Sequence, residues 1–139
     1  ARRPFATPDE LKAAAEAIAG ELGREDWLEA FARHPQIGER ADGAVATSTG
    51  ALSSAWSAQE QVGARDAGPD TRAALDEANR AYRERFGYIF IVCASGRSGE
   101  EMLALCRQRL GNDPERELSV AAAEQRRIAG LRLQRLLAP

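Results

Sequence analysis

Helix start and stop signals recur along almost the whole chain, and they limit its fold more than any other feature. The segment Thr7-Pro8-Asp9-Glu10 combines an N-cap threonine, a proline at the first helical position and a glutamate that completes a capping box. Gly87 and Gly111 stand where the apolar periodicity of two later segments stops, as is typical of a glycine just after a helix. This punctuation predicts an all-α protein.

The apolar spacing predicts a single-domain bundle of about six or more helices over residues 1–139. The expected helices are one that starts at Pro8, one from about Arg24 to Arg33, a short one opened by the capping-box pattern Ser57-Ala58-Gln59-Glu60 and closed by Gly68-Pro69, one from about Asp70 to Phe86, one from Ser98 to Gly111, and one from Pro114 to about Leu137. The apolar run Tyr88–Cys93 is β-like, but one strand cannot form a sheet, so we interpret it as a buried extended connector. The Gly-, Ala- and Ser-rich stretch Ala41–Ser54 predicts an exposed loop.

Composition excludes several classes of function. A formal net charge of −2 provides no overall field for binding a nucleic-acid backbone. No apolar run approaches the roughly 18 residues that a membrane span needs, and no basic-then-apolar leader opens the sequence. Two cysteines without CxxC spacing and a single histidine make structural zinc and a disulfide scaffold improbable. We therefore expect a protein of the cytoplasm with no membrane or nucleic-acid partner.

Arg132 is the one charged residue near the centre of the apolar stripe of the C-terminal helix. It lies four residues after Ile128 and four before Leu136. Burying an unpaired guanidinium is costly, so Arg132 should meet either a protein carboxylate or an anionic ligand in a pocket. The pattern leaves both possibilities open. The other arginines of this helix fall at the edge of the stripe or outside it: Arg126, Arg127 and Arg135.

His34 and Glu60 each have a functional and a structural interpretation. His34 is the only side chain whose unperturbed pKa lies near neutrality, so it is the one imidazole available for general acid or base catalysis. It also precedes Pro35, which favours a helix end there, where a histidine is often a favourable cation or a satisfied core group. Glu60 could simply complete the capping box of Ser57. A thiol nucleophile has no flanking motif in its favour.

Several short segments, in a fixed order along nearly the whole chain, resemble one protein family. These segments are Arg3-Pro4-Phe5, His34-Pro35-Gln36-Ile37-Gly38, Ser57-Ala58-Gln59-Glu60-Gln61, Asn79 through Tyr82 to Phe86-Gly87, Ile89-Phe90-Ile91, Gly96-Arg97-Ser98, Leu110-Gly111-Asn112 and Ile128-Ala129-Gly130-Leu131-Arg132-Leu133. Together they resemble the 2-oxo-4-hydroxy-4-carboxy-5-ureidoimidazoline (OHCU) decarboxylases of urate degradation. The resemblance implies an all-α fold, usually a homodimer, with no metal and no organic cofactor. It also implies that OHCU is decarboxylated to (S)-allantoin.

The resemblance also implies a set of site residues. The family's His-Pro histidine matches His34, the glutamate of its Glu-Gln pair matches Glu60, and its C-terminal-helix arginine matches Arg132, so these three are the expected catalytic residues. The expected substrate-binding residues are Ser57 and Gln61, which would hydrogen-bond the substrate, and Phe90 and Ile91, which would form a pocket wall whose backbone groups contact the imidazoline ring.

The chain departs from the family pattern in places, and other functions stay open. It begins almost on Arg-Pro-Phe, where family members have a further segment; Ile89 replaces a proline; and the stretch from Ala41 to Ser54 is longer than usual. One alternative is a non-catalytic helical dimerisation or ligand-binding module, and another is a hydrolase that acts on a related ureide. Convergence of His34, Glu60 and Arg132 on one concave pocket would favour an enzyme, and scatter would favour a module.

Overall fold

The computed structural model of the chain describes residues 4–38 and 55–138, and all the regular structure in these two ranges is helical. The helices are α1 (Pro8–Glu21), α2 (Arg24–Ala32), α4 (Val62–Asp66), α5 (Pro69–Phe86), α6 (Gly99–Arg109) and α7 (Pro114–Leu137). Residues 55–60 form a further helical segment, and the described ranges contain no strand. The all-α fold class is therefore confirmed. The loop expected over 41–54 lies outside the described residues.

Most of the predicted helix ends are confirmed by their caps. The Thr7 side chain accepts a hydrogen bond from the backbone N–H of Glu10 at 3.2 Å, and Ser98 does the same for the residue three positions later at 3.1 Å. Asp113 caps α7 in the same way, at 3.0 Å. Gly87, with φ +82°, ends α5 in the left-handed conformation that favours glycine. Each cap satisfies a backbone group that a helix end leaves without an intrahelical partner.

The prediction that Ser57 opens a helix through a capping box is wrong. Ser57 lies inside the helical segment 55–60, and its hydroxyl accepts a hydrogen bond from Arg132. The helical path is interrupted at Gln61 before α4 begins. The end of this helix is as predicted: α4 ends at Asp66, just before Gly68-Pro69, and Pro69 occupies the first position of α5. A tertiary contact thus uses the hydroxyl that the local pattern assigned to capping.

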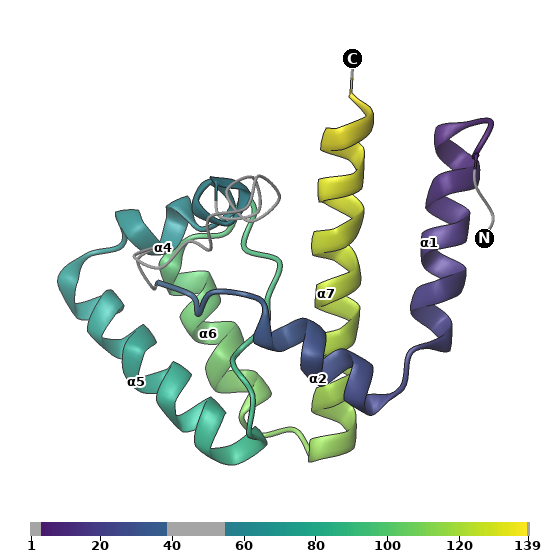
Figure 1. Ribbon diagram of the computed structural model, residues 1–139. Coiled ribbons are helices and arrows are strands. Elements are labelled where there is room, and N and C mark those ends of the chain that lie inside the picture. Colours follow the sequence, from purple (N-terminus) through teal and green to yellow (C-terminus); the bar gives the residue numbers. More distant parts are fainter. Residues whose placement is uncertain (1–3, 39–54, 139) are drawn as a thin grey trace.

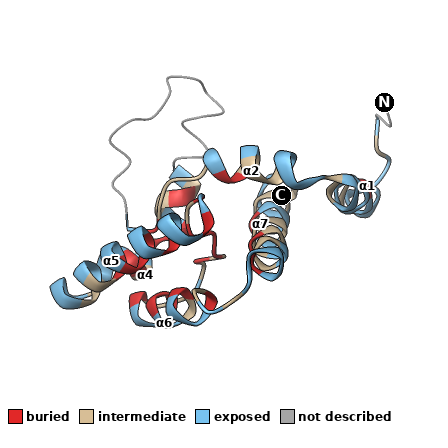
Figure 2. Ribbon diagram, turned by 90° about the horizontal axis from the view of Figure 1, so that it is seen from below, coloured by how far each residue is buried: buried red, intermediate tan, exposed pale blue. Residues whose placement is uncertain are grey.

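The core is built from buried residues of α2, α4, α5, α6 and α7 together with the connector, and Figure 2 draws these residues in red. Residues 88–94 cross this core without regular secondary structure, which confirms the expected buried connector. Phe90 and Ile91 within it are 1% and 2% exposed. Tyr82 of α5 packs edge-on against Phe90, with ring centroids 5.4 Å apart. The connector is therefore held by contacts from surrounding helices.

Helix α1 stands beside α7, away from the core (Figure 1). Ala14 is its one buried residue among those described, and Ile18 is 57% exposed. An exposed ion pair between Glu16 and Arg126 links the two helices. No helix within the described ranges combines the length and the apolar character that crossing a membrane requires.

Two glycines allow α4 to approach the start of α6 closely. A Cβ atom on Gly63 would overlap the carbonyl oxygen of Arg97, and one on Gly99 would lie 2.6 Å from the Cβ atom of Ala67. Neither position has room for a larger residue unless the backbone moves. The close approach fixes α4, and with it the helical segment that precedes α4, against the turn that follows the connector.

Candidate active site

Glu60 and Arg132 form a buried, two-pronged ion pair. Arg132 Nε donates to Glu60 Oε1 at 3.1 Å, and Arg132 Nη2 donates to Glu60 Oε2 at 3.0 Å. Arg132 Nη2 also donates to Ser57 Oγ at 3.0 Å. The Glu60 and Arg132 side chains are 9% and 17% exposed. Arg132 therefore meets a protein carboxylate, one of the two partners that its place in the apolar stripe required.

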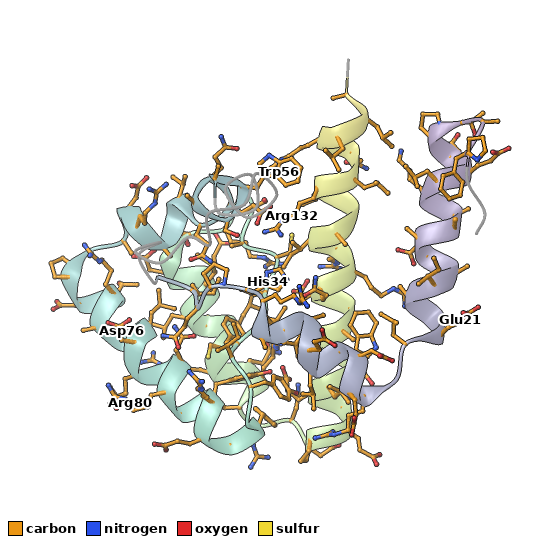
Figure 3. All side chains as sticks on the ribbon, viewed as in Figure 1. Glu21, His34, Trp56, Asp76, Arg80 and Arg132 are labelled. Carbon is orange, nitrogen blue, oxygen red and sulfur yellow. The ribbon has the colours of Figure 1, made fainter. Side chains whose placement is uncertain are left out.

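His34 follows the end of α2, and its backbone N–H donates to the Phe31 carbonyl at 3.1 Å. Burial lowers the pKa of the imidazole from its ordinary value, and the nearby positive charge of Arg132 lowers it further. Contacts with the Gln125 side chain and the charge of Glu60 act in the opposite direction but do not reverse this shift of the pKa. The imidazole is consequently neutral at neutral pH and able to accept a proton. Figure 3 places His34 and Arg132 in the central part of the molecule beside α7.

The short turn after His34 is held by two buried amide side chains. Gly38, with φ +86°, donates its backbone N–H to Gln61 Oε1 at 3.0 Å. Asn79 of α5 donates from Nδ2 to the Ile37 carbonyl at 2.9 Å and is 1% exposed. The His-Pro-Gln-Ile-Gly segment is thereby fixed against the residues that follow Ser57. In this arrangement the side-chain amide oxygen of Gln61 orients the backbone at Gly38. Hydrogen bonding of Gln61 to the substrate stays a prediction.

One pocket brings most of the predicted site residues together. Its enclosed volume is about 20 Å³. Its lining comprises His34, Pro35, Ile37, Ser57, Glu60, Gln61, Phe90, Ile91, Val92, Ala94 and Ile128. Arg132 is absent from this lining, but it binds Ser57 and Glu60, which belong to it. His34 and Glu60 therefore line one pocket, and Arg132 contacts that lining without belonging to it; the catalytic roles of the three stay a prediction.

The structure adds two residues of α7 that the sequence interpretation did not include. Arg135 Nη1 lies 3.4 Å from Glu60 Oε1, although its spacing put it at the edge of the apolar stripe or outside it. Gln125 contacts His34. Along α7, successive members of the series Gln125, Ile128, Arg132 and Arg135 are three or four residues apart, so they share one helix face. That spacing is the signal that could have identified both.

Other kinds of chemistry have less support in the part of the chain that the structure describes. There, no group of three or more His, Cys, Asp or Glu side chains is arranged to hold a metal ion. Both cysteines are free thiols. Burial raises the pKa of Cys93, and it raises the pKa of Cys106 to about 11. Both thiols are therefore protonated at neutral pH and are poor nucleophiles.

Known proteins resemble this chain over most of its length. A family model described as OHCU decarboxylase matches residues 1–134. The uric acid degradation bifunctional protein TTL of Arabidopsis thaliana is 35% identical over 137 residues, which span 96% of this chain and 40% of that protein. The OHCU decarboxylase of Amia calva is 40% identical over 72 residues, which span 52% of this chain and 40% of that protein. This chain thus matches about two fifths of the length of each of these relatives.

A solved structure gives the same result for the fold. A crystal structure of an OHCU decarboxylase in the presence of (S)-allantoin superposes with a TM-score of 0.80 and 35% sequence identity. The match covers 97% of this chain and 84% of that one. The likeness therefore includes the helices that surround the pocket.

Proposed function

This chain belongs to the OHCU decarboxylase family, and from that membership we propose that it decarboxylates OHCU to (S)-allantoin in urate degradation. The observation that most supports the proposal is the convergence of His34, Glu60 and the connector residues Phe90 and Ile91 on one pocket. Arg132, which lies on α7, binds the carboxylate of Glu60. The arrangement combines an acid–base group with an anion-binding group, which this reaction requires.

The proposed substrate is small and anionic, and the cationic group beside the pocket suits its charge. OHCU has a carboxylate and a hydroxyl group on one ring carbon beside an imine. The enclosed volume of about 20 Å³ holds about one water molecule, so the lining has to move apart to admit OHCU. We assign Arg132 the substrate carboxylate or a ring oxygen, which would replace the Glu60 carboxylate at the fork that Nε and Nη2 now direct at Glu60. Ser57 and Gln61 would hydrogen-bond the substrate.

In the proposed reaction the ring is the electron acceptor. Breaking the bond between the ring carbon and the carboxylate releases carbon dioxide, and the electron pair of that bond enters the ring through the adjacent imine. The imine nitrogen takes up one proton from solvent, the substrate hydroxyl loses a proton to become a carbonyl, and the ring carbon that was part of the imine gains one. The enzyme therefore has to orient the carboxylate and transfer protons, and it needs no further electron acceptor.

His34 is the group to which we assign the proton transfers. Its lowered pKa keeps the imidazole neutral, so it can accept a proton from the substrate hydroxyl and return it to a ring carbon. The charge of Glu60 raises that pKa, so the carboxylate stabilises the imidazolium formed between the two transfers. Glu60 would also accept hydrogen bonds from the ureido and ring N–H groups. Proton delivery from one face yields a single enantiomer.

We propose further that the chain forms one domain, acts as a homodimer and resides in the cytoplasm. Its two free cysteines suit a reducing compartment. Ile18 on α1 and Leu136 on α7 are large apolar side chains that are 57% and 61% exposed, and a second copy could cover them. Light scattering on the purified chain should give the mass of a dimer.

Substitution tests the assignment of catalytic residues. His34→Gln removes the proton acceptor and should slow OHCU consumption by about 10²–10⁴-fold. Arg132→Gln should raise KM and lower kcat. The matched control is Arg127→Gln on the same helix, because the Arg127 side chain is 66% exposed and forms its ion pair with Glu124 within α7. The control should stay within twofold of wild type. A folded His34→Gln variant with near-wild-type turnover would show that the assignment is wrong.

A further inference from the structure

A buried polar cluster lies at the junction of α5, α6 and α7, outside the candidate active site. We define it as Tyr82, Arg109, Asn112 and Glu117. Glu117 Oε1 accepts hydrogen bonds from Tyr82 Oη and from Arg109 Nε, each at 2.6 Å, and Glu117 Oε2 accepts one from Asn112 Nδ2 at 2.9 Å. Glu117 and Tyr82 are 0% exposed and Arg109 is 5% exposed. The cluster therefore contains a buried ion pair between Arg109 and Glu117, and most of its polar groups have hydrogen-bond partners.

The cluster also holds the connector that forms one wall of the pocket. Arg109 Nη1 donates to the Ile91 carbonyl at 2.6 Å. The Arg109 guanidinium lies over the Phe90 ring, 4.7 Å from its centroid. Arg109 itself does not line the pocket, whereas Phe90 and Ile91 do. One guanidinium thus joins the buried carboxylate to both wall residues.

Stability alone gives a weak reason for this ion pair. Desolvation of two charges is costly, and well-packed apolar side chains of similar size often replace such a pair without loss of stability. An apolar side chain, however, cannot donate to the Ile91 carbonyl. Residues 88–94 have no regular secondary structure, so their backbone groups depend on contacts with other elements. The guanidinium supplies one of these contacts at the centre of the wall.

We propose that Arg109 and Glu117 are positioning residues for the substrate pocket, an inference that rests on the proposed function. Arg109 fixes the carbonyl of Ile91 and the ring of Phe90, and Glu117 fixes the orientation of Arg109. The wall contacts the substrate in its ground state, so loosening it weakens substrate binding more than it affects proton transfer by His34.

Arg109→Lys tests the proposal, because lysine keeps the positive charge but lacks the fork that reaches Glu117 and Ile91 together. KM for OHCU should rise about tenfold while kcat stays within about threefold of wild type. A purely structural role would instead lower the fraction of folded enzyme and leave KM unchanged. The matched control is Arg107→Lys on the same helix, because Arg107 is exposed and does not line the pocket. Its KM should equal that of wild type.

Two further measurements keep the test decisive. If Arg109→Lys does not fold, Glu117→Gln replaces it, because the amide keeps the shape but lacks the negative charge that holds the Arg109 guanidinium in place; the same rise in KM is expected. Hydrogen exchange over residues 88–94 should be faster in the variant than in wild type, with no change in α1. If wild type does not act on OHCU, the proposed function fails, while the exchange measurement still tests the positioning role. An unchanged KM together with unchanged exchange over residues 88–94 would overturn the proposal.

Discussion

Arg132 and Glu60 should stabilise the folded protein as a pair, as well as contribute to substrate binding. The effect of substituting one of them should therefore depend strongly on whether the other is present. Arg132→Gln removes two hydrogen bonds to Glu60 and one to Ser57, and it leaves a carboxylate that is 9% exposed. Removing one partner of a fully buried pair costs about 3–5 kcal/mol. Arg132 is 17% exposed, and Arg135 remains 3.4 Å from the carboxylate, so we expect a smaller loss of about 2 kcal/mol.

A double-mutant cycle measures this coupling. Arg132→Gln, Glu60→Gln and the double variant are unfolded in urea, with the transition followed by far-ultraviolet circular dichroism. The coupling free energy should be about 1–2 kcal/mol. The control is the same cycle on Arg126 and Glu16, a pair that also links α7 to another helix, with side chains 41% and 60% exposed. Its coupling should be about 0–0.5 kcal/mol. Equal coupling in the two cycles would refute the argument from burial.

The pKa of His34, the only imidazole in the chain, should lie below its ordinary value of 6.5 in proton NMR of the folded protein. Arg132→Gln should raise this pKa, because a positive charge that opposes protonation is lost. The stability that neutral His34 contributes should be complete above about pH 6.5 and should be lost as the pH falls through the folded-state pKa, and a folded-state pKa above 6.5 would contradict this sign. Gly63→Ala should lower the urea midpoint by the equivalent of about 1–3 kcal/mol, since its Cβ would overlap the Arg97 carbonyl oxygen. Gly130→Ala, in a helical site with nothing within 4 Å of the added Cβ, should instead stabilise the protein by about 0.5–1 kcal/mol, and equal effects of the two substitutions would contradict the close approach.

Local signals predicted the helices well because most caps use side chains only three residues from the group that they satisfy. Thr7, Ser98 and Asp113 all follow this rule. Ser57 has the same local pattern, but its hydroxyl binds Arg132, which is 75 residues away in sequence. The competing contact depends on how α7 packs, and no short sequence window contains that information. Tertiary packing therefore overrode the local pattern at this one start signal.

The candidate site was predictable in part. The position of Arg132 in an apolar stripe required an anionic partner, yet the identity of that partner depended on a contact across 72 residues. The resemblance supplied His34 and Glu60, and the structure places both in one pocket. The pair Arg109 and Glu117 was missed because a basic residue in the last turn of a helix and an acidic one in a first turn usually face solvent. Their burial follows from the turn between α6 and α7, which folds the two helices around the connector.

The central claim is that this chain catalyses a stereospecific decarboxylation. The direct test generates OHCU from urate with urate oxidase and hydroxyisourate hydrolase, adds the folded chain, and follows the circular dichroism of the allantoin formed. We predict rapid formation of the S enantiomer, well above the slow racemic product of spontaneous decay. Allantoin that forms at the spontaneous rate and without optical activity would contradict the proposed function.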